Sequence, residues 1–217
     1  MLSRENIKHF YNQFGAKQDS QAFYEQPAFD LLLEHGQFTE ATSVIEFGCG
    51  TGRLAQQLLS AYLPASATYV GADFSETMIR LSRERLADFG TRVRVQRTDG
   101  RMQLDLPAAA FDRFISTYVL DLLPSGDIVT LLQEAHRLLK PGGCLCLVSL
   151  TKSRRGVSRL VIGVWQLVYA IRPRWVGGCR PIALLPYLSR AQWGLDFQRV
   201  VTAYGVPSEV VIAHRLR

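Results

Sequence analysis

The sequence predicts an α/β fold in which a doubly wound, mostly parallel sheet carries helices on both faces. From residue 43 onward, short apolar runs alternate with stretches of helical periodicity, and this alternation is typical of βα units that build a parallel sheet. The apolar runs are nearly continuous, as expected for strands that are covered on both sides. The length of 217 residues allows one main domain with a substantial core.

The expected elements follow this alternation in chain order. Two amphipathic helices open the chain, at 4–14 and 21–35, before any strand. Further helices are expected at 53–61, 76–89 and 127–139. Strands are expected at 44–47, 68–72, 93–96, 114–118, 144–150, 197–204 and 209–214. The residues Gly205 to Ser208 separate the last two strands and predict a hairpin turn.

Composition and charge set the broad class of protein. Hydrophobic residues make up 47% of the chain and charged residues 20%, which excludes disordered and fibrous classes. The net charge of +6 is uneven, because residues 1–150 carry −3 and residues 151–217 carry +9. The basic C-terminal third indicates either an anionic partner or a solvated arginine-rich face, and both explanations stay open.

The cysteines and the apolar runs bear on localisation. The four cysteines form no C-x-x-C pair, and the chain begins without an apolar signal segment. The longest uncharged apolar run, Leu160 to Ile171, has 12 residues, whereas a membrane span needs about 20. We therefore expect a cytoplasmic protein. No metal site is expected, because Cys144 and Cys146 share one face of a strand without companion ligands.

The strongest functional signal is a strand that runs into a glycine-rich turn and then a helix. Residues 44–54 read Val-Ile-Glu-Phe-Gly-Cys-Gly-Thr-Gly-Arg-Leu. Glycines let the backbone approach a ligand closely, and the start of a helix offers unpaired amides. The next strand ends at Asp73, 21 residues after Gly52, where a carboxylate can accept hydrogen bonds from two ribose hydroxyls. The pattern indicates a nucleoside site, and the G-x-G-x-G spacing disfavours a dinucleotide-dependent oxidoreductase.

These residues resemble the class I S-adenosylmethionine-dependent methyltransferases, whose first motif is commonly E/D-x-G-x-G-x-G. The resemblance runs from about Val44 to Leu150 and includes the helix-to-strand turn Leu-Leu-Lys-Pro-Gly-Gly at 138–143. It implies a Rossmann-like sheet of seven strands with an antiparallel strand in the C-terminal hairpin. The most similar group contains the ubiquinone and menaquinone methyltransferases and many small-molecule methyltransferases.

The resemblance implies S-adenosylmethionine as the cofactor, with S-adenosylhomocysteine as its product. It places Gly48, Gly50 and Gly52 in the loop under the methionine part and Asp73 at the ribose. The other cofactor residues that it implies are Tyr11, Glu46, Phe74, Met78, Asp99, Gly100 and Thr117. A structural role under the loop for Glu46 and a core role for Met78 stay open.

Two residues are candidates for a proton acceptor. Methyl transfer from a sulfonium mainly requires alignment of the acceptor with the methyl group, so a base is often optional. Where the acceptor is a hydroxyl or an activated carbon, a carboxylate or a histidine can remove the proton. In related enzymes the segment after the fourth strand lies beside the methyl group, which makes Asp121 the first candidate, with a loop-capping role equally open. His9, on the N-terminal helix, is the second candidate.

The parts outside the core are expected to set acceptor specificity. We expect residues 1–42 to form a helical lid, residues 43–217 the methyltransferase core, and residues 151–188 an irregular insertion that covers the substrate. The insertion carries Trp165 and Trp175 among flanking arginines. This favours a small apolar or aromatic acceptor, including a lipid- or quinone-like one, and peripheral contact with an anionic membrane. A soluble lid would explain the apolar residues equally well.

Two other functions stay open. A chain that kept the fold and the cofactor without the chemistry would be an S-adenosylmethionine-binding interaction protein. A nucleic-acid methyltransferase would use the basic C-terminal third. However, residues 116–119 read Ser-Thr-Tyr-Val, whereas amino-methylating DNA enzymes carry an N/D-P-P-Y motif there, and no RNA-binding module is recognisable. Nucleic acid is therefore a disfavoured partner, and the sequence makes no prediction of the oligomeric state.

Overall fold

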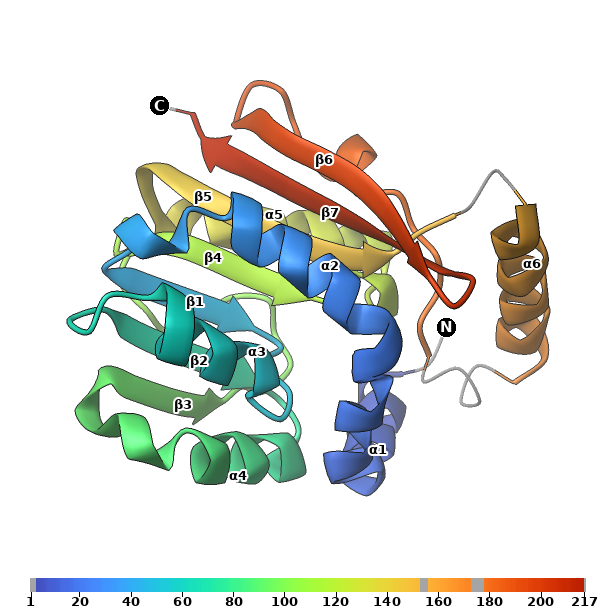
Figure 1. Ribbon diagram of the computed structural model, residues 1–217, viewed down its shortest axis with the longest axis horizontal. Helices are drawn as coiled ribbons and strands as arrows, with labels where there is room; N and C mark the ends of the chain where they lie inside the picture. Colours follow the sequence, from blue (N-terminus) through green and yellow to red (C-terminus); the bar gives the residue numbers. More distant parts are fainter. Residues whose placement is uncertain (1–2, 153–155, 173–177, 217) are drawn as a thin grey trace.

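The computed structural model describes residues 3–152, 156–172 and 178–216. Within these residues, seven strands form one sheet in the order β3-β2-β1-β4-β5-β7-β6, and β7 alone runs in the direction opposite to the other six. The strands are β1 (Ser43–Phe47), β2 (Thr68–Asp73), β3 (Val93–Arg97), β4 (Phe111–Thr117), β5 (Leu139–Leu150), β6 (Trp193–Ala203) and β7 (Val206–Arg215). The predicted Rossmann-like sheet with an antiparallel strand in its closing hairpin is confirmed (Figure 1).

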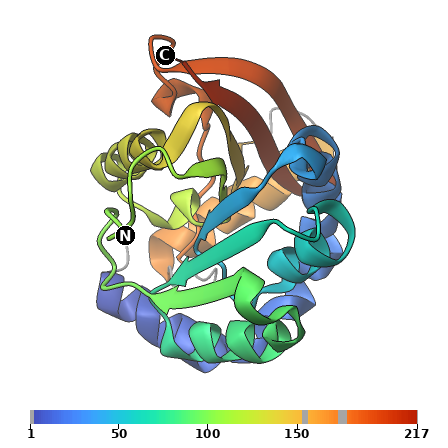
Figure 2. The same ribbon diagram turned by 90° about the vertical axis from the view of Figure 1, so that its left-hand side faces the viewer.

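Helices cover both faces of the sheet. One face carries α2 (Ala22–His35), α3 (Arg53–Gln57) and α4 (Glu76–Arg85), and the other carries α5 (Ser125–Leu138) (Figure 2). At the end towards which the parallel strands point lies α1 (Arg4–Phe14), beside the 3₁₀ helix η1 (Gly15–Gln21). Both predicted N-terminal helices are present. However, only the first lies at this end, because α2 buries its apolar side chains against the sheet.

Alternation of side chains along the strands divides the core into two layers. In β1, Val44 belongs to the layer under α2, α3 and α4, whereas Ile45 and Phe47 belong to the layer under α5. Cys144 and Cys146 of β5 lie on one face of their strand, as their spacing predicted, in the layer under α2, α3 and α4. Both are free thiols. Burial on both faces explains why the strands read as nearly continuous apolar runs.

Two of the predicted helices are shorter than expected. The helix expected at 53–61 is α3 followed by a π-helical turn, Leu58–Tyr62. The helix expected at 76–89 ends at Arg85 and continues as a 3₁₀ segment in which Gly90 takes a φ of 58°. That left-handed residue redirects the chain into β3, which an α-helix could not do at this point.

The closing hairpin is tighter than predicted. Its turn consists of Tyr204 and Gly205, whose φ angles are 52° and 81°. Val206–Ser208, which were expected in the turn, belong to β7, and Val206 pairs with Ala203. A two-residue turn with positive φ at both positions matches the twist of the flanking strands, so the hairpin closes without a longer loop.

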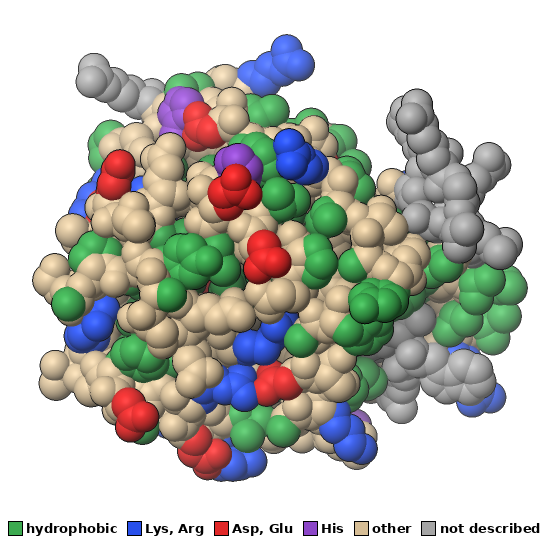
Figure 3. All heavy atoms as spheres, in the orientation of Figure 1, with side chains coloured by type: hydrophobic (Ala, Val, Ile, Leu, Met, Phe, Trp, Pro, Cys, Tyr) green, Lys and Arg blue, Asp and Glu red, His purple; other side chains and the backbone are tan. Residues whose placement is uncertain are grey.

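The insertion that was expected to be irregular contains a helix of 16 residues, α6 (Gly156–Ile171). This stretch contains no proline, and the prolines of the insertion, Pro173, Pro181 and Pro186, all follow it. Figure 3 shows hydrophobic side chains over α6, on the same side of the molecule as the hairpin tip. Trp175 lies outside the described residues. No helix in the described part of the chain combines the length and apolar character that crossing a bilayer requires.

One carboxylate fastens the start of β4 to the start of β1. Asp112 accepts hydrogen bonds from the backbone N–H and hydroxyl groups of Thr42 and Ser43 at 2.7–3.0 Å. The Lys140 ammonium donates to the other carboxylate oxygen at 2.8 Å. Partial burial alone would raise the pKa of Asp112, but these donors outweigh it and hold the pKa well below its usual range. Two strands far apart in the sequence are thus joined by one charged group.

We expect Asp112→Ala to lower the free energy of unfolding at pH 7 by about 2 kcal/mol, because hydrogen bonds to a charged group are lost. The folded state lowers this pKa, so the stabilisation is complete above the unfolded pKa of about 3.9 and is lost as the pH falls towards the folded value. Denaturant unfolding at pH 7 and at about pH 3 measures both effects. Asp88→Ala, at an exposed position, is the control, and an equal loss in both variants would contradict this role.

Candidate functional site

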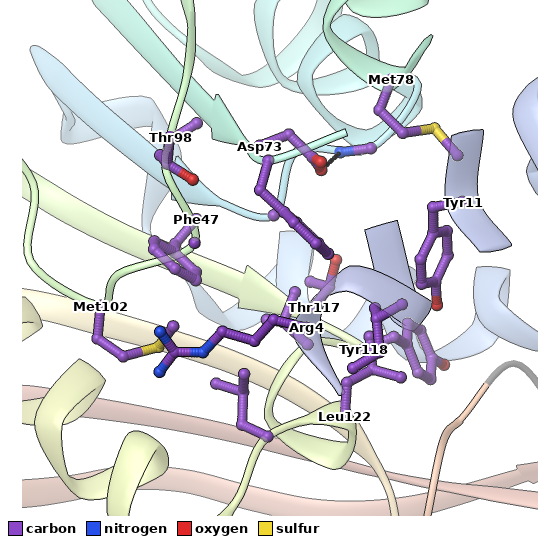
Figure 4. Close-up of a pocket in the computed structure, with 18 of the residues that line it drawn as sticks. Arg4, Tyr11, Phe47, Asp73, Met78, Thr98, Met102, Thr117, Tyr118 and Leu122 are labelled. Atoms are coloured by element: carbon purple, nitrogen blue, oxygen red, sulfur yellow. Dashed lines mark hydrogen bonds between the residues drawn. The ribbon is translucent and has the colours of Figure 1, made fainter. Parts of the chain in front are cut away.

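A cavity opens at the carboxyl ends of the parallel strands, where the strand order reverses between β1 and β4. Together with the open solvent at its mouth, it has a volume of about 760 Å³. Figure 4 shows side chains from α1, β2, α4 and the ends of β1 and β4 pointing into it. Open α/β sheets bind their ligands at such a switch point.

The cavity collects residues that are distant in the sequence. Eight of the residues predicted to bind the cofactor line it: Tyr11, Gly48, Gly50, Asp73, Phe74, Met78, Gly100 and Thr117. They come from α1, the glycine loop, the end of β2, α4, the segment after β3 and the end of β4. The fold therefore brings most of the predicted cofactor residues to one place.

Asp73 holds the glycine loop against the end of β2. The Gly50 N–H donates to Asp73 Oδ2 at 3.0 Å (Figure 4). The Ser75 N–H donates to Oδ1 at 2.9 Å. Burial raises the pKa of Asp73, and the backbone donors oppose this shift. The carboxylate thus orders the loop and also lines the cavity.

Two glycines of the loop leave space that a side chain would fill. Gly48 and Gly50 take φ angles of 80° and 52°. A Cβ atom on Gly48 would lie 2.2 Å from Val119 Cγ2, and one on Gly50 would lie 2.8 Å from Gln18 Oε1. Both positions therefore require glycine, for their backbone conformation and for the close approach of neighbouring atoms.

Glu46 and Gly52 lie outside the lining and support the loop. The Glu46 side chain is buried and accepts a hydrogen bond from the Tyr69 hydroxyl at 2.5 Å. Burial raises the pKa of Glu46 to about 8. Gly52 starts α3 with a φ of 78°, packed closely against Ser82. This environment favours the structural role that the sequence left open for Glu46.

Asp99 and His9 lie apart from the cavity. The Asp99 side chain is exposed and pairs with Arg101 at 3.2 Å, although the flanking residues Thr98 and Gly100 line the cavity. His9 is exposed on α1 and is not part of the lining. The structure does not bring these two side chains to the others, so their predicted roles rest on the sequence alone.

The sequence analysis missed Gln18, which lies over the glycine loop. Its Oε1 atom is buried and has no hydrogen-bond partner in the described part of the chain. The neighbouring Asp19 accepts a hydrogen bond from the Thr51 hydroxyl at 2.6 Å and pairs with Arg85 at 2.5 Å. These contacts fix η1 over the loop. No local motif marks Gln18, because its position depends on the contact of its neighbour Asp19 with Arg85, which lies 66 residues further along the sequence.

Tyr118 was also missed, and it shapes the other end of the cavity. Its φ of 55° is uncommon for an aromatic residue. The backbone N–H donates to Val148 O at 2.8 Å, and the hydroxyl bonds to that of Ser208 at 2.9 Å. Figure 4 shows its ring at the same end of the cavity as Tyr11. Strained conformations of this kind concentrate at functional sites, and the sequence alone contains no sign of them.

Asp121 lies buried behind this end of the cavity. Its Oδ2 atom accepts a hydrogen bond from the Leu150 N–H at 3.1 Å, and Oδ1 has no partner among the described residues. Burial raises the pKa of Asp121 to about 7. Tyr11 lines the cavity, and its pKa is raised by burial and by the nearby Cys179 and Asp121. It therefore connects the buried carboxyl group with the cavity.

This combination of fold, glycine loop and cavity can be compared with known proteins. Residues 44–143 match the family model described as a methyltransferase domain. The chain is 30% identical over 168 residues to a trans-aconitate 2-methyltransferase of Azoarcus. The matched residues cover 76% of this chain and 58% of that protein. These matches identify residues 44–143 as a methyltransferase domain.

Two further proteins are similar to this methyltransferase domain. A demethylmenaquinone methyltransferase of Thermus thermophilus is 30% identical over 142 residues, which cover 65% of this chain and 60% of that protein. The N-methyltransferase NodS of Bradyrhizobium japonicum, solved with S-adenosyl-L-homocysteine, matches with a TM-score of 0.67 at 16% identity, covering 89% of this chain and 88% of that chain. This likeness confirms the fold. The chain spans about three fifths of the length of both curated relatives.

The residues of the methyltransferase domain fit S-adenosylmethionine. This cofactor has an ammonium and a carboxylate on its methionine part, two ribose hydroxyls and an adenine ring. The buried, unpartnered Gln18 Oε1 can accept a hydrogen bond from the ammonium group, and Asp73 can accept from the ribose. Phe74 and Met78 supply apolar surface for a ring. The donor and acceptor chemistry therefore agrees with the family.

We expect Asp73→Ala to weaken binding of S-adenosylhomocysteine by more than about tenfold, because hydrogen bonds to a charged group are lost. Calorimetric titration measures the change. Asp88→Ala is the matched control at an exposed position and should bind as the unmodified chain does. Unchanged affinity in a folded Asp73→Ala protein would refute the ribose assignment.

We expect Gln18→Ala to lower the affinity for S-adenosylhomocysteine without lowering the stability of the fold. The Oε1 atom has no partner in the described protein, so its removal should leave the unfolding midpoint unchanged or slightly higher. The affinity for S-adenosylhomocysteine should fall about tenfold, because an acceptor for the ammonium group is lost. Gln13→Ala, at an exposed position of α1, is the control. Equal losses of stability and affinity would contradict a ligand-binding role.

Proposed function

We propose that this chain transfers a methyl group from S-adenosylmethionine to a small apolar or aromatic acceptor, with lipid- and quinone-like molecules as the favoured class. The cavity wall carries this proposal. Beside the predicted cofactor residues, apolar side chains line the space: Ile7, Phe47, Met102, Val119, Leu122 and Leu123. A predominantly apolar wall with a few polar groups is typical of sites for small apolar ligands. The methyltransferase domain supports the reaction type.

The relatives support methyl transfer and differ in acceptor. One is named for trans-aconitate, a tricarboxylate, and another for demethylmenaquinone. Binding of a tricarboxylate calls for free cationic side chains. The lining contains Arg4, but its guanidinium pairs with Asp127 at 2.7 Å. The apolar wall and this engaged cation favour a quinone-like acceptor over a polyanionic one.

S-adenosylmethionine supplies an activated methyl group, so the protein has to align the acceptor and exclude water. We assign the closure of the site to the N-terminal lid. Asn12 Oδ1 accepts a hydrogen bond from the Ser75 hydroxyl at 2.6 Å, and the Thr77 hydroxyl donates to Asn12 O at 3.1 Å. Together with the ion pair between Asp19 and Arg85, these contacts hold the lid over the cavity.

Asp121 is the proposed proton acceptor. When a hydroxyl acceptor is methylated, the methyl–sulfur bond breaks, a methyl–oxygen bond forms, and the hydroxyl proton must leave. A carboxyl group with a pKa near 7 is suited to take this proton at neutral pH. Tyr11 lines the cavity and interacts with Asp121, so it is placed to pass the proton on. The exposed His9 remains the second candidate.

A lipid- or quinone-like acceptor resides in a bilayer, so peripheral contact with an anionic membrane belongs to this proposal. The net charge of +9 in residues 151–217 supports such a contact, because it is attractive for anionic headgroups.

The proposed function is tested by binding and transfer assays on the purified chain. Calorimetry should show binding of S-adenosylmethionine and S-adenosylhomocysteine and none of NAD. Labelled methyl groups should then move to quinols or phenols and not to a tricarboxylate. Binding without transfer to any acceptor would favour the interaction protein, and transfer to nucleic acid would favour that alternative. Absence of binding would contradict the proposal.

Asp121→Asn is expected to lower kcat by about 100-fold or more, as loss of a general base does. The kcat of the unmodified chain should rise with pH through about 7 as Asp121 ionises, and the variant should lack this inflection. The amide oxygen can still accept the Leu150 N–H, and Asp105→Asn at an exposed position is the control. Should His9→Ala lose activity while Asp121→Asn does not, the proton acceptor would be His9.

A further inference from the structure

We propose that α6 and the tip of the β6–β7 hairpin form a surface that docks this chain on an anionic lipid bilayer. The proposal rests on the proposed function in one respect: docking would give the site access to an apolar acceptor in the bilayer. The surface itself is argued from exposed apolar area, from charge and from its contacts with the cavity.

The helix α6 carries apolar side chains on two opposite faces. On the inner face, Ile162 is buried, and the Trp165 indole N–H donates to Cys179 O at 3.0 Å. Three residues of the outer face follow helical spacing and are 55%, 61% and 69% exposed: Val164, Leu167 and Ile171. A helix that is apolar all round is normally covered on every side, by protein or by lipid. Among the described residues, the inner side of α6 packs on the protein, and these three side chains of the outer face stay exposed.

The hairpin tip extends this apolar surface. Val161 of α6 lies against Gly205, since a Cβ atom there would be 2.8 Å from Val161 Cγ2. The adjacent Tyr204 is 78% exposed, and its ring meets that of the exposed Phe23 edge-on at 5.2 Å. Figure 1 shows α6 and the hairpin tip at the same end of the molecule. Tyrosine suits a bilayer surface, because its ring is apolar and its hydroxyl is polar.

Charge identifies the occupant of this surface. The sequence contains no Asp or Glu between Glu134 and Asp196, whereas residues 151–195 include eight Lys and Arg. Lys152 and Arg172, which precede and follow α6, are exposed. A second copy of the chain would bring the same positive charge to the surface, whereas anionic headgroups attract it. The charge therefore favours a bilayer over self-association.

The docking surface is connected to the acceptor end of the cavity. The Trp165 indole of α6 donates to the Cys179 backbone oxygen, and Cys179 lies close to Tyr11, which lines the cavity. With 16 residues, α6 is too short to span a bilayer and is suited to lie in its interfacial plane. Docking through α6 would thus hold the acceptor end of the cavity at the lipid headgroups.

Vesicle flotation with matched variants tests this surface. The full chain is mixed with vesicles of phosphatidylcholine alone or of phosphatidylcholine with phosphatidylglycerol. The test variant carries Leu167→Glu and Ile171→Glu, and the control is Val129→Glu, at a 45% exposed position of α5. The unmodified chain and the control should float with the anionic vesicles only, and added salt should release them. The double variant should bind at least about tenfold less, because two apolar anchors are replaced by charges.

Each outcome decides between the occupants. No flotation of the unmodified chain, or equal flotation of the double variant, would overturn the proposal. Sedimentation that shows a dimer of the unmodified chain and a monomer of the double variant, without flotation of either, would assign the surface to a second copy. Every variant is also titrated with S-adenosylhomocysteine. Flotation without any binding of this ligand would refute the proposed function and leave the docking surface standing.

Discussion

The hydrogen bond between the Asp73 carboxylate and the Gly50 N–H is the constraint on which the cavity depends. It joins the loop after β1 to the end of β2 at a distance of 3.0 Å. The loop can adopt this position only because Gly48 and Gly50 tolerate positive φ and leave room for Val119 and Gln18. The backbone donors offset the cost of burying the carboxylate, and the carboxylate in turn fixes the position of the loop. The order of the loop and the polar lining of the cavity therefore share one group.

The rest of the molecule converts this fixed loop into an enclosed site. The sheet supplies rigid strand ends, and Asp112 keeps β1 and β4 in register at their opposite ends. The segment of α1 and η1 borders the space on another side, held by Asn12 and Asp19. Rigid strand ends thus form one part of the cavity wall, while α1, η1 and the segment after β4 supply the rest.

Much of this arrangement could be predicted from local sequence patterns. The sheet and the cofactor residues of the loop and of β2 follow from continuous apolar runs, glycine spacing and a carboxylate that ends a strand. Gln18 and Tyr118 could not be predicted in this way, because one depends on a distant ion pair and the other on an unusual φ. The direction of the Asp121 side chain, behind the cavity wall, is likewise set by the Leu150 N–H on another strand. Local patterns predict elements, whereas such contacts need three-dimensional packing.

The contacts of the N-terminal segment have a consequence for its response to salt. Polar contacts that join α1 and η1 to the core include Arg4 with Asp127, Asp19 with Arg85, and Asn12 with the start of α4. Two of these contacts are ion pairs between partly exposed side chains, and dissolved salt screens such pairs. Raising the ionic strength is therefore expected to loosen α1 and η1 from the mouth of the cavity.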